Sequence, residues 1–165
     1  MKEPGRAWKF GDDISTDHIA PGRFYHLRSN LEELAKYALV DAREEFPREV
    51  QPGDFVVAGN NFGLGSSREH AAIVIKLAGA KAVLAASFAR IFYRNAINVG
   101  LPVLVCDTDA IDDGDRLSLD IENSVVVNEA NDKRIECQPI PPFMRKILDS
   151  GGLANYIRKH GGFPK

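Results

Sequence analysis

The segment Gly59–Ala72 constrains the fold of this chain more than any other stretch. Its sequence is Gly-Asn-Asn-Phe-Gly-Leu-Gly-Ser-Ser-Arg-Glu-His-Ala-Ala, and it follows the apolar run Phe55–Ala58, which predicts a buried strand. The apolar residues that continue to Ala78, just before Gly79, predict a helix that glycine stops. Three glycines therefore separate a strand from a helix, which is the arrangement of an α/β fold.

The two serines and the arginine at the start of this helix suit an anion. The first N–H groups of a helix lack internal partners, and the helix dipole makes that end positive. Ser66 or Ser67 can cap the helix, which would leave the other hydroxyl free. Arg68 offers a planar fork that matches a carboxylate or a phosphate. The pattern also fits a simple capped turn, and it is neither a Walker loop nor a dinucleotide fingerprint.

The composition is that of a globular protein. The chain has 165 residues, 44% of them hydrophobic and 27% charged, and residues 1–165 are expected to form one domain. A net charge of −2 without a Lys/Arg cluster speaks against binding to nucleic acid or to an anionic membrane. The N-terminus lacks a signal-peptide pattern, and no apolar run reaches membrane-spanning length, so the expected location is the cytoplasm.

The apolar pattern changes after Asp107. Before it, buried runs alternate with helical segments, so the strand–glycine loop–helix core is expected at about 50–106. After it, short alternating runs predict antiparallel strands, followed by C-terminal helices, at about 107–165. The change marks a layer boundary, because the second part is too small for a core of its own. The expected strands are 2–10, 55–58, 82–86, 102–106, 116–121, 124–128 and 134–138. The expected helices are 31–37, 71–78, 88–98, 141–148 and 153–160.

Three segments, in the same order, resemble the swivelling domain of the aconitase superfamily. They are Asp12–Ile19 with its Thr-Asp-His-Ile sequence, Gly65–Ala72, and Ser87–Pro102. The resemblance covers roughly residues 10–105 and implies a three-layer β/β/α fold with a mixed sheet. The length resembles that of the separate small subunits of 3-isopropylmalate dehydratase and homoaconitase, in their compact archaeal type.

The resemblance also implies the reaction. Such a subunit completes a heteromeric hydro-lyase that removes water from a small 2-hydroxy di- or tricarboxylic acid and returns it in the other orientation. The preferred assignment is the isopropylmalate enzyme of leucine biosynthesis, while homoaconitase and a dialkylmalate dehydratase stay open. Two other classes also stay open, a non-catalytic anion-binding module and an RNA-binding derivative.

The cysteines bear on the cofactor. The chain has only Cys106 and Cys137, in different predicted elements and without metal-ligand spacing. An iron–sulfur cluster is normally held by more cysteines than this chain can offer at one site. Both are therefore expected to be small core residues, and this chain is expected to bind no metal. The resemblance implies that a large partner subunit carries a 4Fe–4S cluster, and that the small subunit is inactive alone and could self-associate when isolated.

The motif residues receive roles from the resemblance. Ser66 corresponds to the serine that acts as the base in its alkoxide form, although it could instead only cap the helix. A helix N-terminus and nearby cations would stabilise that anion. Ser67 corresponds to a serine that orients the substrate, with capping as the alternative. Arg68 corresponds to the arginine that binds a substrate carboxylate, and an internal Glu such as Glu69 is its alternative partner.

Two candidates lie upstream of the motif. Asp17 corresponds to an aspartate that pairs with a histidine of the large subunit near the active site, and a turn-forming role is the alternative. Arg28 lies where aconitase has a substrate-binding arginine. An arginine suits a carboxylate arm and would be costly against an isopropyl group, although surface exposure would make it uninformative. The loop 23–30 is expected to order over the substrate.

Overall fold

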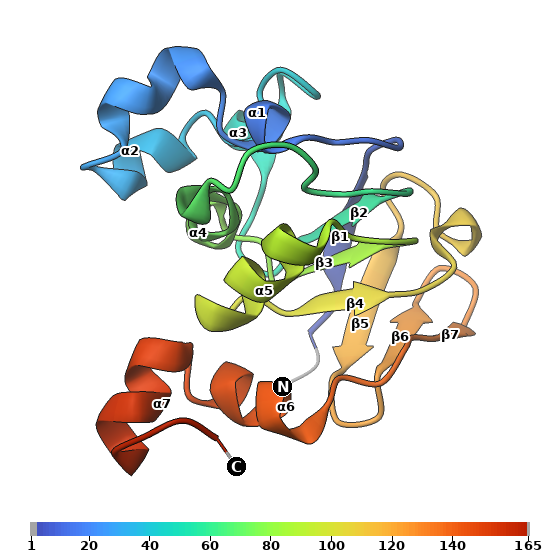
Figure 1. The fold of residues 1–165 in the computed structure, drawn as a ribbon. Coiled ribbons are helices and arrows are strands. Elements are labelled where there is room, and N and C mark those ends of the chain that lie inside the picture. Colours follow the sequence, from blue (N-terminus) through green and yellow to red (C-terminus); the bar gives the residue numbers. More distant parts are fainter. Residues whose placement is uncertain (1–2, 165) are drawn as a thin grey trace.

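The computed structural model describes residues 3–164 and has a seven-stranded mixed sheet with the strand order β4-β3-β2-β1-β5-β6-β7 (Figure 1). The strands are β1 Gly5–Lys9, β2 Phe55–Ala58, β3 Ala82–Ala85, β4 Val103–Val105, β5 Arg116–Asp120, β6 Val125–Asn128 and β7 Lys133–Glu136. The α-helices are α1 Thr16–Ile19, α2 Leu31–Ala35, α3 Phe46–Glu49, α4 Glu69–Ala78, α5 Arg90–Asn98, α6 Pro142–Asp149 and α7 Leu153–His160. Two short 3-10 helices are η1 Gly22–Leu27 and η2 Thr108–Ala110.

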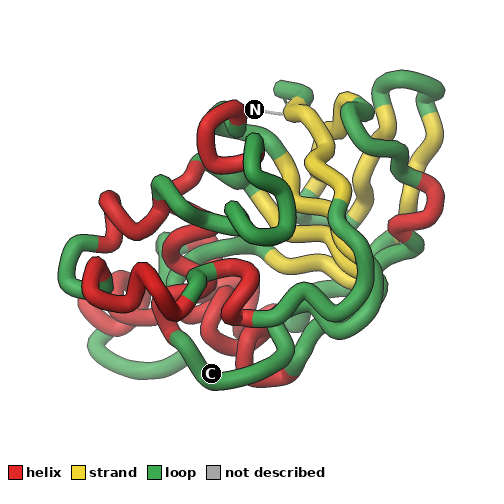
Figure 2. Tube along the Cα trace, turned by 90° about the horizontal axis from the view of Figure 1, so that it is seen from above, coloured by secondary structure: helices red, strands yellow, loops and turns green. Residues whose placement is uncertain are grey.

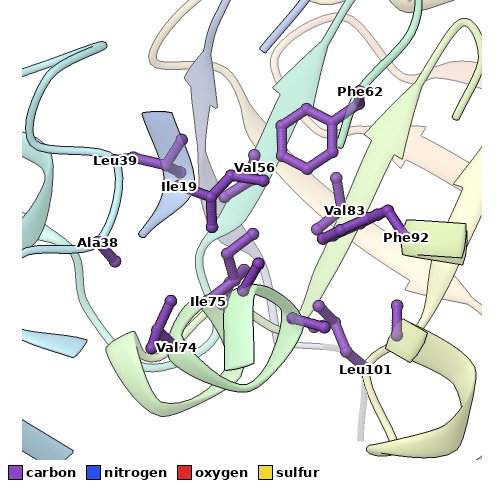
Figure 3. Packing of buried hydrophobic residues seen from close by; sticks show 14 of the residues in the cluster. Ile19, Ala38, Leu39, Val56, Phe62, Val74, Ile75, Val83, Phe92 and Leu101 are labelled. Atoms are coloured by element: carbon purple, nitrogen blue, oxygen red, sulfur yellow. The ribbon is translucent and has the colours of Figure 1, made fainter. Parts of the chain in front are cut away.

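The parallel half of the sheet consists of β1 to β4. Strand β2 pairs in parallel with β1 and β3, and β3 pairs in parallel with β4. Alternate residues point to opposite faces. Val56 and Val83 belong to the core beneath the helices, and Figure 3 shows them pointing from their strands toward Ile75 of α4. Phe55 and Leu84, their neighbours in sequence, belong to a second core on the other face.

The antiparallel half continues the sheet from β1 through β5, β6 and β7. Its apolar face is turned toward the parallel half, because Leu117 and Val126 share the second core with Phe55 and Leu104. Figure 2 shows most of the helices gathered on one side of the strands. The molecule thus has a helical layer, a parallel layer and an antiparallel layer, and the predicted three-layer α/β fold with a mixed sheet is confirmed.

The two outer strands of the curled sheet approach each other. The N–H of Gln138, just past β7, donates to the carbonyl of Val105 at the end of β4, at 2.8 Å. Cys106 follows β4 and Cys137 follows β7, and both residues are buried, as predicted for core residues. Its interaction with Cys137, together with burial, raises the pKa of the Cys106 thiol. The sequence did not predict that these cysteines meet.

Local differences from the sequence prediction have identifiable causes. Helix α1 is absent from the predicted helices, and it forms because the Ser15 hydroxyl caps it and the His18 ring accepts the Ser15 N–H. The short helix α3 is also absent from the predicted helices, and it contains a proline. Pro47 lies in the first turn of α3, where a missing N–H removes no helical hydrogen bond.

Candidate active site

The glycine loop between β2 and α4 is held against the segment that follows β1. Gly63 N–H donates to the carbonyl of Ile14 at 2.7 Å, and Thr16 N–H donates to that of Leu64 at 2.8 Å. Figure 1 shows α1 beside this loop. Gly63 has φ +87°, and a Cβ there would overlap the ring of Phe92 on α5, so both its backbone and its surroundings require glycine. The loop therefore has one fixed path over the carboxyl edge of β1 and β2.

Ser66 and Ser67 do not cap the helix, so the capping alternative for the two serines is wrong. Helix α4 begins at Glu69, its N-cap position is Arg68, and no side chain caps it. Arg68 is extended there, and its N–H donates to the carbonyl of Ser66 at 2.8 Å. Ser67 and Ser66 therefore lie one and two residues before the N-cap position. Both serines are exposed, and neither hydroxyl has a hydrogen-bond partner within residues 3–164.

Arg68 has an internal anionic partner, which is Asp17 and not Glu69. Its Nη1 donates to Asp17 Oδ1 at 3.1 Å and to the carbonyl of Ala20 at 2.7 Å. The Arg68 side chain is only 24% exposed. An arginine at a helix N-terminus opposes the helix dipole, so a nearby carboxylate stabilises it. The structure thus joins two predicted site residues that are 51 positions apart in the sequence.

Asp17 lies on α1 with its side chain 68% exposed. Its Oδ1 also accepts the N–H of Gly22, at 2.9 Å, so it closes the turn into η1. The hydrogen bond from Gly22, followed by that from Arg68, lowers the pKa of Asp17 below its usual value. The predicted turn-forming role is therefore present, and Asp17 is an anion at neutral pH.

Arg28 is exposed and is occupied locally. Its Nη1 donates to the carbonyl of Tyr25 at 3.1 Å, and its guanidinium lies 4.4 Å from the centre of the Tyr25 ring. That ring lies 5.6 Å from the ring of His70, in the first turn of α4. Burial, together with the charges of Arg68 and Arg28, lowers the pKa of His70. Sequence reasoning missed the contact between Tyr25 and His70, since no local pattern links the two residues.

The loop 23–30 is largely folded. Residues Gly22–Leu27 form η1, and Arg23 makes a two-pronged ion pair with Asp41, both N–O distances being 2.6 Å. The stacked rings of Phe24 and Tyr37, 4.0 Å apart, add an apolar contact to this anchor. Ordering of this loop over a substrate stays a prediction.

The structure also bears on metals and membranes. Among residues 3–164, no three His, Cys, Asp or Glu side chains are grouped so that they could hold a metal ion. None of the helices in this part of the chain is both long and apolar enough to cross a bilayer. The two cysteines lie between the sheet halves, away from the glycine loop, since they belong to the second core.

The arrangement can bind an anion and hold a proton acceptor beside it. The glycine loop carries two exposed hydroxyls and a guanidinium that is held through Nη1, and it leads into the positive end of the ten-residue helix α4. Because both serines face solvent, chemistry that requires exclusion of water needs another surface to cover them. The candidate site is therefore an exposed surface of this chain.

Comparisons with known proteins agree with this geometry. Residues 14–108 match the family described as the aconitase C-terminal domain. The chain is 63% identical to "3-isopropylmalate dehydratase small subunit 2" of Archaeoglobus fulgidus, over 98% of each chain. It is 61% identical to "3-isopropylmalate dehydratase small subunit 1" of Thermotoga maritima, again over 98% of each.

A solved structure has the same fold. The crystal structure of 3-isopropylmalate dehydratase from Methanocaldococcus jannaschii superimposes with a TM-score of 0.93 at 48% sequence identity, covering 98% of this chain and 96% of that one. The family match includes Asp17, the glycine loop and α5, which are the elements that build the site. The chain belongs to the aconitase C-terminal domain family, among the 3-isopropylmalate dehydratase small subunits.

Proposed function

We propose that this chain is the small subunit of 3-isopropylmalate dehydratase, a hydro-lyase of leucine biosynthesis that interconverts 2- and 3-isopropylmalate. The observation that carries the proposal is the 63% identity to the Archaeoglobus fulgidus subunit over nearly the whole of both chains. We place the protein in the cytoplasm, and we propose that residues 1–165 act as one domain.

Ser66 is the proposed base. The reaction removes a proton from a carbon next to a carboxylate, so a proton acceptor must lie beside a carboxylate-binding group. The Ser66 hydroxyl is exposed, makes no capping bond, and precedes Arg68 by two residues. The positive end of α4 and the guanidinium of Arg68 both reduce the free energy needed to form an alkoxide there. Ser67 is proposed to orient the substrate through its hydroxyl or its N–H.

Arg68 is the proposed ligand of a carboxylate that both isopropylmalate isomers carry. The contacts of Arg28 are compatible with a substrate that carries an isopropyl group. Its guanidinium is already engaged by Tyr25 and remains in solvent, so it does not have to be buried without a partner against an apolar group. To bind a carboxylate arm of the substrate, the Arg28 guanidinium would instead have to leave Tyr25.

The partner is proposed to be a large subunit that covers the exposed serines. The family implies a 4Fe–4S cluster in that subunit, and when bound it supplies a Lewis acid for the departing hydroxyl group. The described residues of this chain do not fit such a cluster, because Cys106 and Cys137 are buried between the sheet halves and no third ligand accompanies them. The chain's own part is proton transfer and carboxylate binding, and alone it could self-associate.

The test is reconstitution. The chain is mixed anaerobically with its cluster-loaded large subunit, and the dehydration rates of 2-isopropylmalate and of homocitrate are compared. A preference for isopropylmalate is expected. A preference for the tricarboxylate would move the assignment to homoaconitase, and activity on neither substrate, combined with tight substrate binding by the free chain, would favour a non-catalytic anion-binding module.

A further inference from the structure

We infer that Asp17 is a positioning residue that, with the Ala20 carbonyl, holds Nη1 of Arg68 so that the opposite edge of the guanidinium faces the substrate carboxylate. The inference rests on the proposed function, because it takes Arg68 as the carboxylate ligand. It differs from the role that the resemblance implies for Asp17, which is to pair with a histidine of the large subunit.

The hydrogen bonds of Arg68 define which edge is free. Both of its side-chain bonds within the described residues use Nη1, at 3.1 Å to Asp17 Oδ1 and 2.7 Å to the Ala20 carbonyl. Nε and Nη2 have no partner within residues 3–164. A guanidinium forms its best carboxylate contacts with two parallel N–H groups on one edge. Fixing Nη1 therefore leaves the Nε–Nη2 edge as the one complete fork.

Asp17 is itself fixed by the backbone. Its Oδ1 accepts the Gly22 N–H at 2.9 Å as well as the Arg68 bond, so one oxygen links the turn after α1 to the start of α4. Without that second bond, an aspartate with a 68% exposed side chain would be free to rotate away. The combination gives Arg68 a defined orientation before substrate arrives, which reduces the ordering cost of binding.

Gly22 keeps the free edge open. A Cβ at this position would lie 3.4 Å from Asp17 Oδ1 and 3.7 Å from Nη2 of Arg68. Gly22 does not have the positive φ that would demand glycine for the backbone alone. A methyl group there would fit, but it would occupy space beside the nitrogen that the carboxylate must reach. Gly22 thus helps to keep the Nε–Nη2 edge of Arg68 accessible to the substrate carboxylate.

The first variant is Asp17→Asn in the assembled enzyme. Asparagine keeps the size and an acceptor for Gly22 but removes the charge that orients Arg68. We expect the KM for 2-isopropylmalate to rise roughly tenfold, the effect of weakening one charged hydrogen bond, while kcat changes little, because a carboxylate is held equally in the ground and transition states. Asp41→Asn is the matched control, since it removes the nearby exposed ion pair with Arg23 and should change KM by less than about twofold.

A double-mutant cycle separates positioning from a general structural effect. Arg68→Lys keeps the charge but loses the fork, so it should raise KM by itself. If Asp17 acts through Arg68, adding Asp17→Asn to Arg68→Lys should raise KM little further, whereas independent roles would multiply the two effects. Gly22→Ala should also raise KM, without a change in the melting temperature.

The affinity between the subunits is also measured, by titration calorimetry without substrate. It distinguishes positioning of Arg68 from pairing of Asp17 with the large subunit. A normal KM for Asp17→Asn with weakened subunit affinity would overturn the inference in favour of pairing with the large subunit. An equal KM effect of Asp41→Asn would overturn it in favour of a general loosening of η1. If the wild-type pair of subunits is inactive, both the proposed function and the role of Asp17 are overturned. This outcome differs from the others because only here does the wild-type control fail.

Discussion

The parallel half of the sheet is buried almost throughout, whereas β7 of the antiparallel half is largely exposed, and every candidate site residue follows a strand of the parallel half. Asp17 and Arg28 follow β1, and Ser66, Ser67 and Arg68 follow β2, its parallel neighbour. Parallel strands run into loops that lead to helix N-termini at one shared edge, which is where α/β sheets bind ligands. The antiparallel strands β5, β6 and β7 are joined to one another by short turns, with no helix between them. The difference indicates that the antiparallel half supports the site without entering it.

The strongest test of that comparison is Ser66→Ala, set against Arg134→Ala on β7. Loss of a general base should lower kcat of the assembled enzyme by roughly 10²–10⁴-fold. Arg134 is exposed on the antiparallel half, so its replacement should leave the rate unchanged. Steady-state rates and circular-dichroism melting of both variants are the measurements. A Ser66→Ala enzyme that keeps most of its rate would remove Ser66 from the role of base.

A second test compares two buried side chains. Phe62 is fully buried and packs against Phe88 and Phe92, next to the glycine loop, so Phe62→Ala should lower the free energy of unfolding by about 3–5 kcal/mol and also raise KM. Leu119 of β5 lies in the second core, and Leu119→Ala should lower it by about 2–5 kcal/mol with a normal KM. Urea unfolding and steady-state kinetics measure both effects. A shifted KM in Leu119→Ala would break the distinction between the halves.

Two glycines with nearly the same backbone give a matched third test. Gly63 has φ +87° and Gly114, in the turn before β5, has φ +86°. Alanine in this conformation is strained by about 1–2 kcal/mol. A Cβ at Gly114 meets nothing within 4 Å, whereas one at Gly63 overlaps Phe92, which adds about 1–3 kcal/mol. Equal losses of unfolding free energy in the two variants would show that the loop near the site is no more tightly packed than the distant turn.

The smallest effect concerns acid stability, through Asp113. Burial opposes ionisation of this carboxyl, but hydrogen bonds from the Lys9 N–H and from Arg43 outweigh it and lower its pKa. A lowered folded-state pKa stabilises the protein above the unfolded value and ceases to do so as pH falls through it. Wild type should thus exceed Asp113→Asn in stability by up to about 1 kcal/mol at pH 7, and the advantage should decline below about pH 4. A constant difference from pH 7 to pH 3, measured by urea unfolding, would contradict this.

The sequence predicted the fold better than it predicted the contacts of the site. The three strands after β1 in the parallel half, and helices α4 and α5, are runs whose period and glycine boundaries are local properties, and the structure has them within a few residues of the predicted positions. The motif residues were also identified in sequence. The caps were not, because the cap of α4 depends on the path of the loop after Gly65, which no local pattern encodes.

Contacts between distant residues could not be predicted in the same way. Asp17 with Arg68, Tyr25 with His70, and Cys106 with Cys137 are each brought together by the sheet and its crossover connections. The sequence contains each partner, but a single sequence carries no signal that pairs them. Arg68 could be recognised as needing an anion, because it opposes a helix dipole, and only the fold identifies that anion as Asp17.

The contact between the ends of β4 and β7 affects how the isolated chain interacts with other chains. Exposed sheet edges are templates on which other chains can add strands and aggregate. Here β4 has three residues and its last carbonyl is taken by Gln138, while β7 has four residues with exposed charges at Lys133, Arg134 and Glu136. Short, charged and partly closed edges resist such growth. We therefore expect that the isolated chain does not aggregate through its sheet edges before it meets a partner.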